Sequence, residues 1–242
     1  MRPLLLLSLA AFALPAAVAA AQADRADERE RMVLEVANLV ATSGAREGRQ
    51  LGRPVLEALR RVPRHLFVPE AQRRDAYRDR PLPIGHDATI SAPTIVGLMT
   101  ELLDVEPGHR VLEVGTGSGY QAAILSVLAR EVYSIEIVEP LARSAAARLR
   151  ELGYANVAVR AGDGYAGWPE RAPFDRIIVT AAAPHVPQPL VDQLRPGGRM
   201  VIPVGRSSED HLLMLVEKDA RGRVSRRAIL PVRFVPLVRS GR

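Results

Sequence analysis

Apolar residues recur at two different spacings along the chain, and the change in spacing divides it into two regions. Between residues 25 and 43 the apolar positions lie on one face of an amphipathic helix. A second short helix is expected from Arg53-Pro54, where proline suits the first turn. The stretch from Pro63 to Pro83 is rich in proline and charge, which predicts short turns over the core. Residues 24–91 are therefore expected to form a helical N-terminal subregion rather than an independent domain.

From residue 92 onward, short apolar runs alternate with helical patterns. This alternation predicts an α/β core over residues 92–242, built on a doubly wound, mostly parallel sheet. Ligands in such sheets bind beyond the carboxyl ends of the strands, at the point where the strand order switches direction. Helices are expected at 92–103, 118–130, 140–152 and 189–194, and strands at 110–114, 132–136, 156–160, 174–180, 199–203, 211–217 and 229–235.

The first 23 residues carry a different pattern. No charged residue occurs from Pro3 to Ala23, and Ala21 and Ala23 are the small residues that a signal peptidase reads. Residues 1–23 are interpreted as a secretory signal, so we expect a periplasmic or secreted protein without stable membrane association after cleavage. An uncleaved anchor is one alternative, because the run approaches the ~20 residues that span a bilayer, and a cytoplasmic protein is another. Pro15 and the alanine-rich second half favour cleavage.

Composition narrows the possible chemistry. A chain of 242 residues, 48% hydrophobic and 25% charged, suits one globular α/β domain with short additions. The absence of cysteine excludes disulfides, thiolate zinc sites and a cysteine nucleophile, and the five histidines show no metal-ligand spacing. The net charge is +6, but the arginines are scattered among acids without aromatic residues between them. Neither a metal nor a nucleic-acid partner is therefore expected.

The strongest local motif is a glycine-rich loop, Val111-Leu-Glu-Val-Gly115-Thr-Gly117-Ser-Gly119-Tyr120. Its glycines lie where a buried strand turns into a helix, and glycine there lets the backbone pass close to a ligand. A nicotinamide-binding fold would have its third glycine at the position of Tyr120. The G-x-G-x-G spacing with Glu113 before it instead resembles the first motif of class I methyltransferases, which use S-adenosylmethionine. A tight strand-to-helix turn without a ligand is the structural alternative.

Two further acids follow the next two strands. Glu136 ends the second strand about 20 residues after the loop, where an acid can accept both hydroxyls of a ribose. Asp163, followed by Gly164, lies where the resemblance implies a contact with the adenine amino group, and Glu113 would lie near the ammonium of the methionine moiety. Each acid alone could be a solvated carboxylate at a strand end. Their joint placement after three successive strands favours a cofactor site.

A wider set of motifs resembles the protein-L-isoaspartate O-methyltransferase family, from about Arg31 to Leu237. Thr89-Ile-Ser-Ala-Pro93, Ala181-Ala-Ala-Pro184 and Pro231-Val-Arg-Phe-Val-Pro-Leu237 are more specific to this family than the glycine loop. The resemblance implies a Rossmann-like repair enzyme that moves a methyl group from S-adenosylmethionine to the side-chain carboxylate of L-isoaspartyl residues in damaged proteins. It implies that Ser91 is the catalytic serine, with Thr89 beside it. We expect a monomer.

Methyl transfer to a carboxylate needs no general base, because the acceptor is ionised at neutral pH and the sulfonium methyl group is already activated. A neutral hydroxyl such as Ser91 can donate one hydrogen bond to the carboxylate and leave its other oxygen free to attack. The alternative role for Ser91 is an N-cap of the helix at 92, and the two roles can coexist. The small residues Ala182, Ala183 and Pro184 are expected to leave room for the substrate backbone.

The rival hypothesis is a methyltransferase acting on RNA or on another small substrate. The Asn/Asp-Pro-Pro-Tyr motif of methyltransferases that modify amino groups of bases is absent from the sequence, which weakens this alternative. A cofactor-binding protein without catalysis is a third possibility, and it would not need to keep Ser91 or the segment 181–184. His86 and His185 are expected to be structural or solvated.

Overall fold

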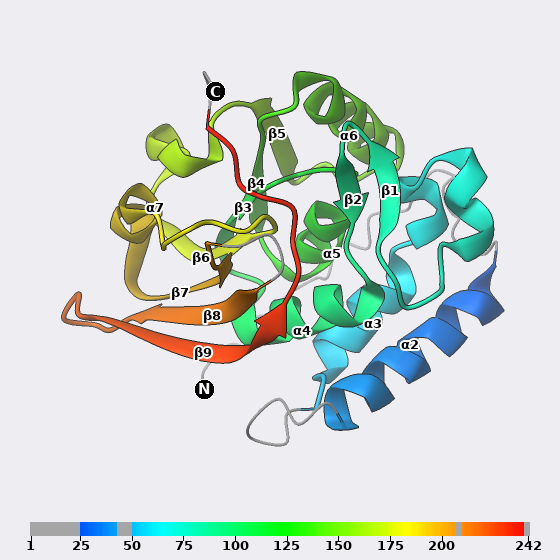
Figure 1. Cartoon of the computed structure of the whole chain (residues 1–242), viewed down its shortest axis with the longest axis horizontal. Coiled ribbons are helices and arrows are strands. Elements are labelled where there is room, and N and C mark those ends of the chain that lie inside the picture. The colour runs from blue at the N-terminus through cyan, green and yellow to red at the C-terminus, as the bar shows by residue number, and fades with distance from the viewer. Residues whose placement is uncertain (1–24, 43–49, 207–209, 240–242) are drawn as a thin grey trace, which may run out of the picture.

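A seven-stranded sheet forms the centre of the computed structural model, which describes residues 25–42, 50–206 and 210–239 (Figure 1). The strand order is β5-β4-β3-β6-β7-β8-β9. The first five strands in this order are mutually parallel, whereas β8 runs antiparallel to both of its neighbours. The predicted doubly wound, mostly parallel sheet is confirmed. Its strands are β3 (Arg110–Val114), β4 (Glu131–Glu136), β5 (Val157–Ala161), β6 (Phe174–Val179), β7 (Leu194–Val204), β8 (His211–Lys218) and β9 (Val224–Val232).

Helices cover both faces of this sheet. Helices α4 (Pro93–Leu103), α5 (Tyr120–Leu128) and α6 (Glu139–Glu151) cover one face. Helix α7 (Gln188–Gln193) covers the other, beside the short 3₁₀ turns η3 (Gly164–Ala166) and η4 (Pro169–Arg171). Adjacent residues Val111 and Leu112 of β3 belong to two separate hydrophobic clusters, because successive side chains of a strand point to opposite faces.

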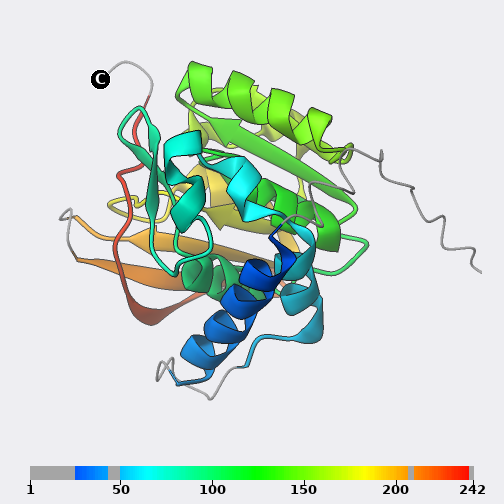
Figure 2. The same cartoon turned by 90° about the vertical axis from the view of Figure 1, so that its right-hand side faces the viewer.

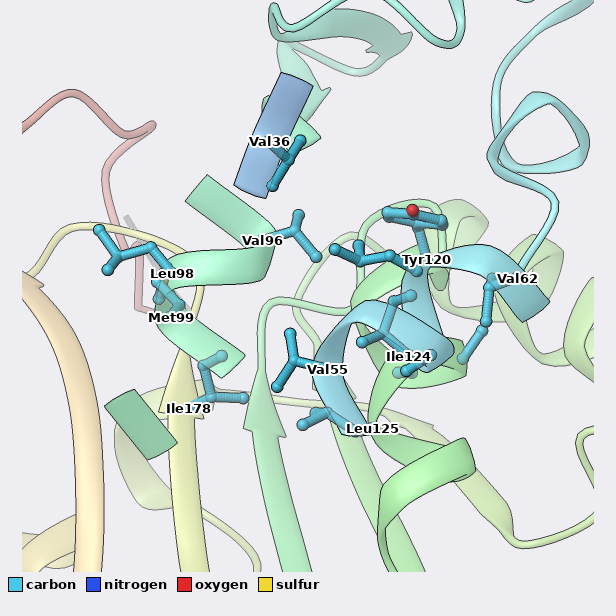
Figure 3. Close-up of a cluster of buried hydrophobic side chains, with 14 of the residues drawn as sticks. Val36, Val55, Val62, Val96, Leu98, Met99, Tyr120, Ile124, Leu125 and Ile178 are labelled. Atoms are coloured by element: carbon cyan, nitrogen blue, oxygen red, sulfur yellow. The ribbon is translucent and has the colours of Figure 1, made fainter. Parts of the chain in front are cut away.

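Two further helices form an outer layer over α4 and α5 (Figure 2). They are α2 (Ala26–Thr42) and α3 (Arg53–Arg61), close to the helices expected from the sequence. Figure 3 shows Val36 of α2 and Val55 of α3 in the same buried cluster as Val96 of α4 and Ile124 of α5. The N-terminal helices therefore share one core with the sheet domain and hold the region around α4 and α5 in place.

The segment between α3 and α4 contains an element that the sequence pattern did not predict. After the 3₁₀ turns η1 (Arg64–Phe67) and η2 (Glu70–Asp75), strands β1 (Leu82–Gly85) and β2 (Ala88–Ile90) form an antiparallel hairpin. Its two turn residues, His86 and Asp87, have φ values of 54° and 56°, as a type I′ turn requires at both central positions. Strands this short, one of them containing a proline, give too few alternating positions to be detected.

The end of the chain also departs from expectation. The last strand ends at Val232, and residues 233–239 leave the sheet, whereas the sequence predicted a strand as far as 235. Figure 1 shows this segment, in red, running from β9 across the end of the sheet. Ala182 donates to the carbonyl of Val235 at 2.8 Å and accepts from Leu237 at 2.7 Å, so the segment is fixed to the residues that follow β6.

Candidate functional site

A cavity of about 240 Å³ lies at the carboxyl ends of β3, β4 and β6. The chain passes from β3 to β4 on one side and returns to β6 on the other, so the cavity occupies the switch point of the sheet. Four groups of residues dominate its lining: the hairpin with Ser91, the glycine loop, the end of β4, and the C-terminal segment. They are residues 86–91, 114–118, 135–138 and 235–238.

Two of the three loop glycines line the cavity. Gly115 and Gly117 have φ values of 98° and 51°, a region that side-chain-bearing residues rarely adopt. A Cβ atom on Gly115 would also collide with the Thr180 hydroxyl, so no larger residue fits. Gly119 lies outside the lining, and a Cβ there would approach Leu149 of α6 to 3.2 Å. The predicted site is thus divided: two glycines face the cavity, and the third allows close helix packing.

Glu136 faces the cavity at the end of β4 and ties that end to the glycine loop. Its Oε2 accepts from the backbone N–H of Gly117 at 2.8 Å, and its Oε1 accepts from Val138 at 3.0 Å. The side chain is 7% exposed and lines the cavity. Each carboxylate oxygen retains acceptor capacity beyond these bonds. Glu136 can therefore accept hydroxyl donors from a ligand without losing its bonds to the loop.

Glu113 lies behind the loop, fully buried and outside the cavity lining. It pairs with Ser134 on β4, whose hydroxyl donates to its Oε2, and Thr116 in turn hydrogen-bonds Ser134. Its Oε1 has no hydrogen-bond partner among the described residues. Burial, reinforced by the nearby charge of Glu136, raises the pKa of Glu113 to about 8. Strand alternation turns this side chain towards the face covered by α4, α5 and α6, and its contact with a ligand ammonium stays a prediction.

Asp163 also lies outside the lining, whereas its neighbour Gly164 is part of it. The Asp163 carboxylate accepts from the backbone N–H of Tyr165 at 2.9 Å and so caps the turn η3. A Cβ atom on Gly164 would collide with Val114 at the end of β3. The backbone at 163–164 therefore approaches the cavity closely, and the adenine contact of Asp163 stays a prediction.

Ser91 and Thr89 line the cavity on the side of the hairpin, together with His86 and Asp87. The alternative role of Ser91 as a helix cap is wrong, because the N-cap of α4 is Ala92 and no side chain of the N-cap contributes a hydrogen bond. The N–H of Thr94 in this turn instead donates to the carboxylate of Asp79. The Ser91 hydroxyl is therefore available to a ligand in the cavity.

The substrate contacts predicted at 182–184 are not part of the lining. Ala182 and Ala183 form isolated β-bridges with Pro236 and Val204, and Pro184 is exposed outside the cavity. The small side chains of Ala182 and Ala183 allow this close backbone pairing, and the contact of 182–184 with the substrate stays a prediction. Ala181 and residues 235–238 line the cavity in their place. The sequence motif ending at Leu237 was the available signal for this wall, but it was interpreted only as a family feature.

Among the described residues, the cavity lining contains no lysine or arginine, although the chain has 33 of them. Its acidic members are Asp87 and Glu136, and most of the remaining surface is apolar. Such a cavity favours a cationic ligand and leaves a carboxylate ligand without a strong counter-ion. Within the described part of the chain, no cluster of three or more His, Asp or Glu residues is arranged for a metal, and no helix is long and apolar enough to cross a membrane.

Comparison of the sequence with known proteins identifies a family that it matches over most of its length. The family model for protein-L-isoaspartate(D-aspartate) O-methyltransferase matches residues 38–242. A relative named protein-L-isoaspartate O-methyltransferase 1, from Cupriavidus necator, is 58% identical over 240 residues, covering 98% of this chain and 93% of the relative.

Two solved structures share the fold over most of the chain. One, named protein-L-isoaspartate O-methyltransferase, is 28% identical with a TM-score of 0.76 and covers 86% of this chain; this chain spans 65% of that longer one. The other, a Plasmodium falciparum protein assigned to the same family, was solved in complex with S-adenosyl-L-homocysteine. It is 25% identical with a TM-score of 0.71, and the match covers 88% of this chain and 99% of that one.

Proposed function

The chain belongs to the protein-L-isoaspartate(D-aspartate) O-methyltransferase family, and we propose that its switch-point cavity brings S-adenosylmethionine and an isoaspartyl carboxylate together. The enzyme transfers a methyl group from S-adenosylmethionine to L-isoaspartyl residues of damaged proteins. In such a residue the chain continues through the β-carboxyl group, so the α-carboxylate hangs free as a side group. One observation carries the assignment of this chemistry to the cavity: the glycine loop, Glu136 and Ser91 line a single cavity that has no lysine or arginine among its described lining residues.

The cavity residues fit the cofactor. Gly115 and Gly117 line the cavity with backbone alone, at φ values that side-chain-bearing residues rarely adopt, which allows a ligand to lie directly on the backbone. Glu136 offers spare acceptor capacity for ribose hydroxyls at the end of β4. The apolar residues Ile135 and Ile137 line the cavity on either side of Glu136 and offer apolar contact to the adenine ring. When bound, S-adenosylmethionine supplies a methyl group that its sulfonium has already activated.

Ser91 orients the acceptor carboxylate. Its hydroxyl donates to one carboxylate oxygen and leaves the other oxygen free for in-line approach to the methyl carbon. A neutral donor suits this role because the acceptor must keep its negative charge. The absence of lysine and arginine from the described lining serves the same end, since an arginine would hold the nucleophile in a strong ion pair.

The walls of the cavity limit the access of water to the reacting atoms. The C-terminal segment is held by backbone bonds to Ala182, and the Tyr165 hydroxyl donates to the Leu237 carbonyl at 3.3 Å. On the opposite side the hairpin covers the cavity with Thr89 and Ile90. A pair of opposite charges attracts more strongly where protein replaces part of the surrounding water, so the same walls favour the approach of carboxylate to sulfonium.

The test is methyl incorporation by the purified protein into an isoaspartyl peptide, an aspartyl peptide of the same sequence, and tRNA. We expect incorporation into the isoaspartyl peptide alone. Incorporation into tRNA would instead support the rival nucleic-acid methyltransferase, and binding of S-adenosylmethionine with no transfer to any of the three would support a protein without catalysis.

A second proposal concerns location: the protein is exported, and its signal is removed after Ala23. Residues 1–23 lie outside the described part of the chain, so the support is the uncharged run from Pro3 to Ala23 and the small residues Ala21 and Ala23. The first described helix begins at Ala26, shortly after this point. The match to the Cupriavidus necator relative covers 98% of the chain and therefore extends into this region.

N-terminal sequencing of the protein from fractionated cells tests export. A periplasmic product that begins at Asp24 is expected, whereas a cytosolic product that begins at Met1 or Met32 would refute it. We further propose that the active unit is a monomer, because the glycine loop, Glu136 and Ser91 of one chain meet in the same cavity, and that it has no stable membrane association once residues 1–23 are removed. Light scattering of the active fraction measures its molar mass, and an active species of twice the mass of the chain would contradict the monomer.

A further inference from the structure

The first turn of helix α4 follows Ser91 directly and has no cap of its own. Its N-cap residue, Ala92, has no side-chain acceptor, and Pro93 has no backbone N–H to satisfy. Ile95 and Val96 both donate to the carbonyl of Ala92, at 3.0 and 3.1 Å. The N–H of Thr94 remains, and it donates to Oδ1 of Asp79 at 2.8 Å, from a residue 15 positions earlier in the chain.

This bond joins the two chain segments on either side of the hairpin. Asp79 precedes β1, which begins at Leu82, and Thr94 follows β2, which ends at Ile90. The bond therefore closes the base of the hairpin that carries the cavity residues 86–91. A carboxylate at a helix N-terminus is also attracted by the partial positive charge of the backbone there.

The segment containing Asp79 is itself anchored to the core through Arg64. This guanidinium is fully buried, and its Nε donates to the carbonyl of Ala76 at 2.8 Å. It lies over the ring of Tyr120, 5.0 Å from the ring centroid, at the start of α5 where the glycine loop ends. Its positive charge attracts Asp79 across the same buried region. The segment that leads to Asp79 is therefore fixed to the core at Ala76, and Asp79 in turn holds the first turn of α4.

We propose that Asp79 is a positioning residue for Ser91. By capping α4 and closing the hairpin, its carboxylate fixes the backbone on both sides of Ser91, and so fixes the direction of the hydroxyl in the cavity. The inference rests on the proposed role of Ser91 in orienting the acceptor. The glycine loop and Glu136 make no hydrogen bond with Asp79 in the described residues, so we expect loss of Asp79 to lower turnover more than cofactor affinity.

The experiment compares Asp79→Ala with Asp79→Asn. A misplacement of about 1 Å costs on the order of 10²-fold in rate, so kcat of Asp79→Ala should fall by roughly ten- to a hundredfold. The Kd for S-adenosylhomocysteine should stay within about twofold of wild type. Asparagine caps helices about as well as aspartate, so Asp79→Asn should restore most of kcat. Hydrogen exchange at the Thr94 amide should accelerate in Asp79→Ala and return towards wild type in Asp79→Asn.

The matched control is Asp175→Ala. Oδ2 of Asp175 accepts from the backbone N–H of Arg110 at 2.7 Å, a long-range bond of the same kind, but at the amino end of the sheet and away from the cavity. Compared at equal folded fraction, this variant should keep wild-type kcat. An equal loss in Asp175→Ala, or no rescue by Asp79→Asn, would overturn the proposal, as would wild-type kcat in Asp79→Ala.

The exchange measurement separates this inference from the proposed function. If the wild-type protein transfers no methyl group to the isoaspartyl peptide, the proposed function fails on its own. Thr94 amide exchange still reports the cap in that case. An unchanged exchange rate in Asp79→Ala would show that Asp79 does not hold this turn, and would overturn the positioning role whatever the substrate.

Discussion

Replacing Glu136 by alanine should weaken cofactor binding while leaving the fold intact. The variant loses the acceptors for Gly117 and Val138 and the acceptors proposed for the ribose. A hydrogen bond to a charged group contributes about 1.5–3 kcal/mol. Since about 1.4 kcal/mol changes affinity tenfold, losing the ribose contact alone should raise the Kd by roughly ten- to a hundredfold. Loosening of the loop at Gly117 adds to this loss.

Calorimetry with S-adenosylhomocysteine measures the effect, and Glu101→Ala is its matched control. Oε2 of Glu101 accepts from the backbone N–H of Gly52 at 2.7 Å, so the same residue type makes the same kind of bond outside the cavity lining. The control should keep wild-type affinity at equal folded fraction. If Glu136→Ala bound as tightly as wild type, the ribose site would lie elsewhere and the reasoning would be refuted.

Three other substitutions test separate parts of the account. Ser91→Ala should keep cofactor affinity but lose turnover by on the order of 10²-fold in steady-state assays, and full activity would exclude the orienting role. Gly115→Ala should lower the free energy of unfolding by about 1–3 kcal/mol in urea titrations, because φ is 98° and the new Cβ would meet Thr180; unchanged stability would contradict this. The raised pKa of Glu113 means that the folded state holds a proton which the unfolded state releases above about pH 4.5. The contribution of Glu113 to the free energy of unfolding is therefore lost as pH rises from about 4.5 towards about 8. Glu113→Gln should flatten this decline in thermal melts recorded across that range. An unaltered dependence of the melting temperature on pH would show that Glu113 does not hold the proton.

The sequence predicted the sheet and the part of the cavity lining formed by Gly115, Gly117 and Glu136, because both depend on local patterns. Buried parallel strands give short continuous apolar runs, and β3 has the predicted bounds, 110–114. The carboxyl ends of parallel strands share one edge, so Gly115, Gly117 and Glu136 had to meet there once the strands were identified. The resemblance placed Ser91 at the same edge, and the structure puts it in the lining.

Features that depend on long-range geometry were not predicted. The side of β3 to which Glu113 points follows from which face each helix covers, and the sequence does not specify this. The pairing of Ala182 with the C-terminal segment joins residues far apart in the chain, so its small side chain suggested space rather than backbone contact. Asp79 lies in a turn-rich stretch without periodicity, and only the structure brings it to Thr94.

The most direct test of the central claim uses a single peptide that carries one isoaspartyl residue together with ordinary aspartyl, glutamyl and C-terminal carboxylates. After incubation with the enzyme and S-adenosylmethionine, tandem mass spectrometry locates the added methyl group. The account predicts one methyl group, on the isoaspartyl residue. Methyl groups distributed over the other carboxylates, or no methylation by a protein that binds the cofactor, would contradict it.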